Sequence, residues 1–269
     1  MVLEFNKERV LKKYFLEHIE KTSIEGVAEK KANNKFGVEM EFNGRNISFF
    51  QLNPVRHKEG ELEQILEITE NIFDDVKFQL DQTGKIEKIT NMADIIEKWT
   101  NLKILHFSDK KKQYVKDFIF NLSKIITNET LLTELIKSNL IFPFIFLGIY
   151  NKDCTRRTSI EREIILHNVF PDNNIPIRIV VEGETDEDGD KIFDFVGKHT
   201  YDFDRFQYIR EIEKKYPQIK GGTGDIFDFE LEGRCIYNSD NVLSYFEIDT
   251  KITVGEKVKY TESYTLEER

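Results

Sequence analysis

The sequence predicts an α+β fold in which antiparallel β-sheet structure from the N- and C-terminal regions packs around a central helical block. Hairpin patterns dominate residues 1–90, apolar stripes at helical spacing follow over residues 91–150, and alternating segments with short turns fill residues 151–269. No repeated strand–helix–strand rhythm is present, which favours antiparallel pairing. We expect a single α+β domain over residues 1–269, with one helix in its last, β-rich region.

The N-terminal region predicts β-structure over residues 10–53, with a helix over Lys7–Lys21 as the competing interpretation. Apolar and polar residues alternate on both sides of the turn dipeptide Asn43-Gly44. That pattern predicts a hairpin over Lys35–Leu52.

The stretch Val76–Trp99 has the clearest local pattern in the chain. It predicts a strand, a turn at Asp81–Gly84, a returning strand, and a helix capped by Thr90 or Asn91. Just before it, Glu61–Asp74 fits a short amphipathic helix, although a strand is also compatible with its pattern.

Two further helices and a run of strands complete the prediction. Wide apolar stripes predict helices over Gln113–Ile126 and Glu129–Ser138, and Tyr208–Tyr216 predicts a helix closed by Pro217. Alternation and β-branched or aromatic residues predict the strands Ile164–Phe170, Ile175–Val181, Lys191–Gly197, Ile226–Glu232, Arg234–Tyr237, Val242–Ile248, Lys251–Val254 and Lys257–Leu266.

Composition limits the classes of function. Charged residues make up 33% of the chain, and the formal net charge is −10. An acidic surface repels phosphate backbones, so we expect no nucleic-acid partner, whereas a basic protein partner is compatible with the charge. The one basic run, Lys110–Lys112, is interpreted as a solvated turn. The 22 phenylalanines and 10 tyrosines imply a bulky aromatic core or a lined apolar groove.

The compartment expected from the sequence is the cytoplasm. Cys154 and Cys235 are far apart without zinc-ligand spacing, and the N-terminal residues lack the pattern of a secretory signal. The longest apolar run, Leu140–Tyr150, is about half the ~20 residues needed to span a bilayer. We therefore expect no membrane span.

One acidic loop has residues suited to a divalent cation. Asp186, Asp188 and Asp190 stand at alternate positions, and oxygen ligands of this kind suit Ca²⁺ or Mg²⁺. The EF-hand pattern fails, because Gly189 precedes the third acid and Gly197 occupies the place of the distal glutamate. The competing interpretation is an exposed acidic hairpin.

No other motif indicates catalysis or a cofactor. The glycines of Lys220–Asp225 follow a helix and precede a strand, which favours a connection over a phosphate loop. There is no GxSxG motif, and the five histidines form no HxxxH or HExxH pair. Cys154 and His167 form a candidate nucleophile and base only if the fold brings them together. No cofactor is expected.

The remaining candidate site is apolar. Trp99 is interpreted as a core anchor, with a ligand platform as the alternative. In Leu140–Tyr150, Phe142, Phe144 and Phe146 alternate with other apolar residues, which predicts a segment buried on both faces. We expect a central strand or the junction between the helical block and the sheet. The alternative makes these residues, together with Tyr150, the wall of a ligand pocket or a partner-docking patch.

The first functional hypothesis is a non-enzymatic protein-interaction module: an adaptor, an immunity-type inhibitor or an assembly component. It rests on the acidic balance and the absence of a reactive constellation. The alternative is a carrier that holds an apolar small molecule between a curved sheet and helices, suggested by the phenylalanine content. An enzyme is the third hypothesis.

Overall fold

The computed structural model describes residues 1–52, 65, 68–69, 71–108, 112–137, 141–155, 159–170, 173–221 and 226–269. Its strands form one 11-stranded sheet in the order β5-β4-β3-β2-β1-β11-β10-β9-β8-β7-β6, and every neighbouring pair is antiparallel. The strands are β1 (Val10–Ile24), β2 (Lys30–Asn43), β3 (Asn46–Leu52), β4 (Asp75–Leu80), β5 (Ile86–Ile89), β6 (Ile160–Val169), β7 (Asn173–Thr185), β8 (Lys191–His199), β9 (Phe227–Tyr237), β10 (Leu243–Val254) and β11 (Val258–Glu268). The antiparallel α+β prediction is confirmed.

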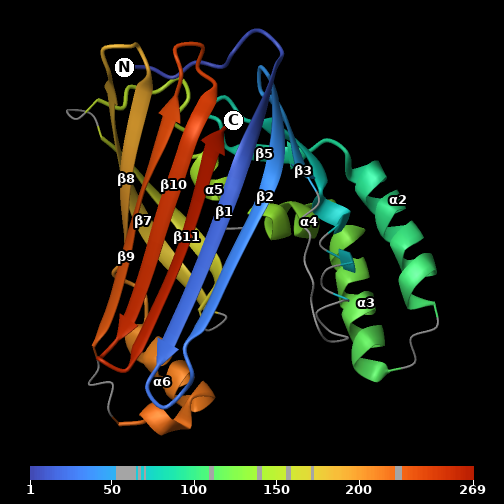
Figure 1. Cartoon of the computed structure of the whole chain (residues 1–269), viewed down its shortest axis with the longest axis vertical. Helices are drawn as coiled ribbons and strands as arrows, with labels where there is room; N and C mark the ends of the chain where they lie inside the picture. The colour runs from blue at the N-terminus through green and yellow to red at the C-terminus, as the bar shows by residue number, and fades with distance from the viewer. Residues whose placement is uncertain are drawn as a thin grey trace.

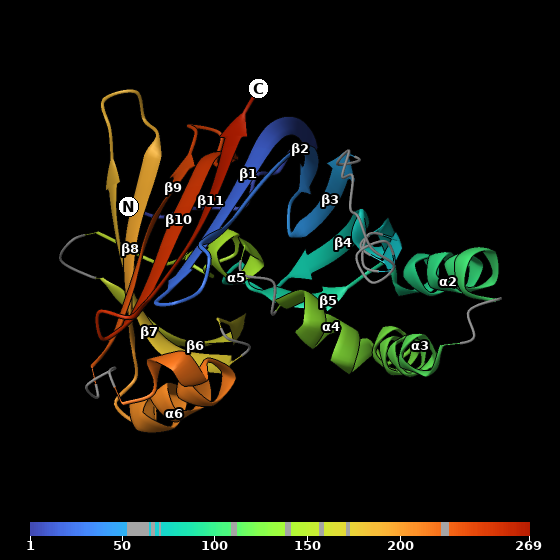
Figure 2. The same cartoon turned by 60° about the horizontal axis from the view of Figure 1, so that its bottom comes forward.

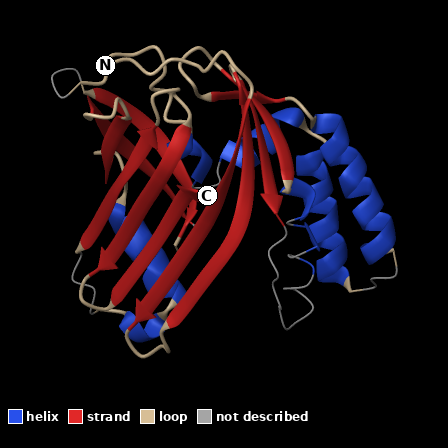
Figure 3. Cartoon of the chain, turned by 45° about the horizontal axis from the view of Figure 1, so that its top comes forward, coloured by secondary structure: helices blue, strands red, loops and turns tan. Residues whose placement is uncertain are grey.

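Two meanders meet at the middle of this sheet. Strands β1–β5 form one and β6–β11 the other, and β1 pairs with β11 from Tyr14 opposite Glu268 to Ile24 opposite Val258. Figure 1 shows β1 in blue beside β11 in red, and Figure 3 shows the strands as one continuous layer. The N- and C-terminal regions therefore join in a single sheet.

The sheet is curved, and its concave face forms much of the core. Along β9, Phe229 and Leu231 are buried while Asp228, Glu230 and Glu232 are exposed. This period-2 alternation lets one face exclude water and leaves the other charged. Figure 2 shows the long strands curving around α5 (Ile141–Ile145), with α6 (Arg205–Lys215) at the end where β6 and β7 fold beneath.

The predicted central block of helices is not confirmed. Helices α2 (Met92–Leu102), α3 (Gln113–Ile126) and α4 (Glu129–Lys137) do form, and a π-helical segment, Lys103–Phe107, extends α2. However, α2 packs on α3, α3 on α4, and α4 on β5 and α5. This row of helices leads away from the β5 edge (Figure 2), whereas α5 lies within the curve of the sheet.

At the junction between β5 and α2, the structure differs from the predicted helix cap at Asn91. Asn91 stands at the N-cap position of α2 but makes no side-chain cap bond. Its amide instead accepts from the backbone N–H of Lys77 at 2.9 Å and donates to the carbonyl of Asp75 at 3.1 Å. These bonds fasten the start of the helix to β4.

The segment around Phe144, predicted as either a central strand or the junction between the helical block and the sheet, forms a short helix. Residues Ile141–Ile145 form α5, and residues further along reach a bend at Gly148, whose φ is +66°. Because the segment is apolar on all sides, its pattern carries no period that distinguishes strand from helix. The helix changes which phenylalanines share a face: Phe142 and Phe146 line one pocket and Phe144 packs on the sheet.

Some predicted elements lie partly outside the described residues. These are half of the Glu61–Asp74 segment, Lys110 and Lys111, and most of Lys220–Asp225. Within the described part, no helix is both long enough and apolar enough to cross a bilayer.

Candidate functional site

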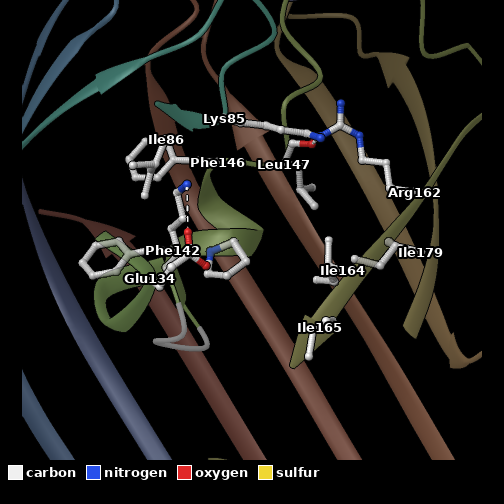
Figure 4. A pocket seen from close by; sticks show the side chains of 12 residues that line it. Lys85, Ile86, Glu134, Phe142, Phe146, Leu147, Arg162, Ile164, Ile165 and Ile179 are labelled. Atoms are coloured by element: carbon white, nitrogen blue, oxygen red, sulfur yellow. Dashed lines mark hydrogen bonds and ion pairs between the residues drawn. The ribbon is translucent and has the colours of Figure 1, made fainter. Parts of the chain in front are cut away.

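An apolar pocket of about 310 Å³ lies where the two ends of the sheet approach each other. Strands β5 and β6 are the outermost strands of the sheet order, yet both contribute to this pocket. The sheet therefore curls far enough for its two edges to face one space, with α5 between them (Figure 4). The lining residues are Lys85, Ile86, Glu134, Lys137, Phe142, Pro143, Phe146, Leu147, Arg162, Ile164, Ile165 and Ile179.

A second cavity lies on the other side of Phe142. It measures about 340 Å³ and is lined from the concave face and from α4 by Leu16, Phe36, Phe49, Gln51, Phe73, Val76, Leu135, Ile136, Ile141, Phe142 and Tyr264. Phe142 meets Phe49 and Phe78 edge to face, each at 5.1 Å between ring centroids. One aromatic ring thus separates two apolar spaces under the same curved sheet.

Helix α5 is held to the sheet by an aromatic stacking contact and by a hydrogen bond. Phe144 stacks on Phe195 of β8 at 5.5 Å between centroids. The hydroxyl of Tyr237 on β9 donates to the carbonyl of Ile145 at 3.1 Å. A satisfied polar group at a buried helix end fixes its position, so the pocket face of α5 is preorganised.

The rim of the pocket is cationic. Arg162 on β6 donates to the backbone carbonyls of Leu147 and Gly148. The side chain of Lys85 extends toward the Arg162 guanidinium (Figure 4). Burial lowers the pKa of Arg162, and burial together with the charge of Arg162 lowers the pKa of Lys85. The positive charges of Lys85 and Arg162 therefore lie close together at a partly desolvated position on the pocket rim.

The carboxylates near this rim already have partners. Glu134 pairs with Lys137 at 3.5 Å. Asp81 accepts at one oxygen from the backbone N–H and hydroxyl of Thr83, at 2.7 and 2.8 Å, and from the backbone N–H of Lys85 at 3.0 Å. Burial alone would raise the pKa of Asp81, but these hydrogen bonds outweigh it and lower that pKa.

A polar cluster on the concave face escaped prediction. Glu262 of β11 accepts from the hydroxyls of Tyr260 at 2.8 Å and Tyr264 at 3.0 Å, and pairs with Nε2 of His18 at 3.0 Å. The ring of His18 also stacks on Tyr264 at 4.2 Å. Tyr264 lines the second cavity, so this cluster lies beside it. The available signal was alternation along β11, which places Tyr260, Glu262 and Tyr264 on one face.

Burial and hydrogen bonding oppose each other at Glu262. Burial raises its pKa, but the bonds from His18, Tyr260 and Tyr264 together hold that pKa below the ordinary 4.5. Burial, and then the charge of Glu262, raise the pKa of neighbouring Glu20. The cluster therefore keeps one carboxylate charged and disfavours a second charge beside it.

The apolar residues predicted as a patch do not all meet. Phe142 and Phe146 line the first pocket, whereas Phe144 faces the sheet. Tyr150 is buried after α5, where its ring stacks on Phe5 at 4.3 Å. Trp99 is fully buried between α2 and α3, with its indole N–H donating to the Ser123 hydroxyl at 3.0 Å, and it lines neither cavity.

The acidic loop forms the turn between β7 and β8. One carboxylate oxygen of Asp186 accepts from the backbone N–H groups of Asp188 at 3.0 Å and Asp190 at 2.9 Å, and Gly189 has a φ of +86°. This is the hydrogen bonding of a turn-forming aspartate. Among the described residues, no group of three or more His, Cys, Asp or Glu is placed to hold a metal ion.

The cysteines are buried within the structure. Burial raises the pKa of Cys154 to about 11, with the charge of Asp153 adding to the effect. A thiol with that pKa stays protonated at neutral pH and is a poor nucleophile. The side chain of His167, its candidate base, lies outside the described residues.

No model of a protein family matches the chain, and no curated protein matches it either. The function is therefore inferred from the geometry of the pocket and its surroundings.

Proposed function

We propose that the protein is a carrier that holds a small apolar molecule in the pocket between α5, β5 and β6. The main support for this proposal is the pocket itself, an apolar space of about 310 Å³ bordered by both edges of the sheet. Small-molecule sites are typically concave, mainly apolar and about 300–1,000 Å³ in volume. The anchoring of α5 by Phe144 and Tyr237 supports a site that exists before the ligand arrives.

The volume sets the size of the ligand. At about 30 Å³ for each non-hydrogen atom, the share that one water takes in the liquid, a space of 310 Å³ holds roughly ten such atoms. Octan-1-ol is therefore a suitable neutral probe. The second cavity, across Phe142, offers further room if that ring rotates away.

Filling the pocket is expected to abolish this binding. Ile164 is half-buried on β6 and points into the pocket, so Ile164→Trp places an indole where the ligand would lie. We expect octan-1-ol affinity, measured by isothermal titration calorimetry, to fall at least about tenfold. Leu131→Trp is the control, because Leu131 is 47% exposed on α4 and lines neither cavity.

Native mass spectrometry of the protein purified from its own source complements the titration. A small molecule of matching size that is released on unfolding supports the carrier proposal. If no such molecule is present and octan-1-ol does not bind, the carrier proposal fails.

A protein-interaction module is the second candidate function, and one observation favours it. Ile104 and Leu105 are 65% and 73% exposed in the π-helical segment, and Phe120 on α3 is 60% exposed. Exposed apolar residues on neighbouring helices are a common feature of contact surfaces. The net charge of −10 suits a basic partner.

The matched variant for this candidate carries Ile104→Ser and Leu105→Ser together. We expect affinity capture from the native source to recover a specific partner with the unmodified protein and to lose it with the variant. Equal recovery by both proteins would exclude this surface as the contact.

The cytoplasmic location stays an expectation.

A further inference from the structure

The rim of the ligand pocket brings two cations, Lys85 and Arg162, close together. Lys85 and Arg162 approach each other across the rim (Figure 4), and within the described part of the chain neither forms a salt bridge. Bringing two positive charges together while removing part of their water is unfavourable unless an anion joins them. Lys137 and Lys152 add further positive potential at Lys85.

Both cations have hydrogen-bonding capacity to spare. A guanidinium carries five N–H donors, and Arg162 donates from two of its nitrogens to the carbonyls of Leu147 and Gly148. The ammonium of Lys85 carries three donors and makes no side-chain hydrogen bond in the described structure. An anion placed between them would receive charge-assisted hydrogen bonds from both.

Among the described residues, no carboxylate forms an ion pair with Lys85 or Arg162. Glu134 is the one acid among the described residues that line the pocket, and it pairs with Lys137. The negative charge of Asp81 favours the charged form of both cations without forming an ion pair with either, and one of its oxygens accepts from Thr83 and from the backbone N–H of Lys85. The remaining place beside Lys85 and Arg162 faces the apolar pocket.

We propose that the ligand is an apolar carboxylic acid whose carboxylate binds between Lys85 and Arg162 while its hydrocarbon chain lies along Ile86, Phe146 and Ile164. The proposal rests on the carrier function and adds the chemistry of the head group. Octanoate, which has a single carboxylate and about the ten non-hydrogen atoms estimated from the cavity volume, is the probe.

The test compares octanoate with octan-1-ol by calorimetry at neutral pH. We expect octanoate to bind about tenfold more tightly, because only the carboxylate brings a negative charge between the two cations. Lys85→Gln should remove most of this preference, because the amide that replaces the ammonium carries no charge. Among the described residues, the Lys85 side chain forms no hydrogen bond or ion pair that this substitution would break.

Lys88→Gln is the matched control. Lys88 is exposed on β5, the strand that begins directly after Lys85, and is not among the pocket-lining residues. The variant therefore changes the net charge equally and should retain the preference for octanoate. Raising the salt concentration should reduce the preference in the unmodified protein, because the rim is accessible to ions.

The possible results test the head-group proposal and the carrier proposal separately. Equal affinity for octanoate and octan-1-ol, or a preference that survives Lys85→Gln, overturns the head-group proposal and leaves the carrier function standing. If neither probe binds, both proposals fall. A preference lost in Lys85→Gln and kept in Lys88→Gln supports both.

Discussion

Gly233→Ala is expected to lower the free energy of unfolding by about 3 kcal/mol, at the upper end of the cost of overpacking a core. Gly233 lies in the middle of β9, opposite Ile248 of β10 and Phe195 of β8. A β-carbon there would lie 2.3 Å from the Phe195 ring and 2.5 Å from the backbone carbonyl oxygen of Glu247. A ring can turn, but the carbonyl belongs to a paired strand, so the strands themselves must separate.

The same substitution should weaken ligand binding. The ring of Phe195 stacks on Phe144 of α5. Phe142 of α5 and Phe146, which follows the helix, both line the pocket. Urea unfolding and octan-1-ol titration measure the two effects. Gly197→Ala is the control, because its β-carbon would approach only side chains, at 3.1 Å or more. Similar losses of stability and of octan-1-ol affinity in both variants would show that the close backbone contact at Gly233 adds no destabilisation of its own.

Glu262→Gln is expected to destabilise the protein by about 3 kcal/mol at neutral pH. The variant removes the charge that His18, Tyr260 and Tyr264 share, and an amide accepts at only one of the two positions. At least one donor on a largely buried face then loses its partner. Chemical denaturation at neutral pH measures the loss.

The pH dependence identifies the cause. The folded-state pKa of Glu262 lies below the ordinary 4.5, so its contribution is complete above that value and disappears as the pH falls through the folded-state pKa. The stability difference between the unmodified protein and Glu262→Gln should therefore shrink as the solution is acidified below the ordinary value. A difference that stays constant on acidification would contradict a charge-based role.

Glu20→Gln is the matched variant within the cluster. Its pKa is raised by burial and by Glu262, which means that the fold disfavours its charge. Removing that charge should leave stability at neutral pH unchanged or increase it, opposite to the effect at Glu262.

Local patterns predicted most of the elements because each strand or helix buries one face. The predicted helix Gln113–Ile126 has the bounds of α3, and the hairpin around Asn43-Gly44 forms with Gly44 at a φ of +58°. Where a pattern was absent or ambiguous, prediction failed. The all-apolar segment before Gly148, which was predicted as a central strand or as the junction between helices and sheet, forms the short helix α5. Separate strands were predicted over Ile226–Glu232 and Arg234–Tyr237, but the structure has one strand, β9, which continues through Gly233.

The candidate site was only partly predictable, since it depends on contacts between distant parts of the chain. The aromatic richness around Phe142 indicated an apolar wall, and Phe142 and Phe146 do line the pocket. Lys85 directly precedes the edge strand β5 and Arg162 lies on the opposite edge strand β6, and no local pattern connects them. The pairing of His18 with Glu262 requires β1 to lie beside β11, which spacing along the chain does not reveal.

The pairing of β1 with β11 also affects how the protein emerges from the ribosome. Strands β1–β5 are translated long before β11, so the hydrogen-bonding groups along one side of β1 have no strand to pair with during most of synthesis. Contacts between such distant segments form slowly, and exposed strand edges favour aggregation. One edge of β1 in the nascent chain therefore stays unpaired until the final hairpin, β10–β11, has been made and β11 pairs with β1.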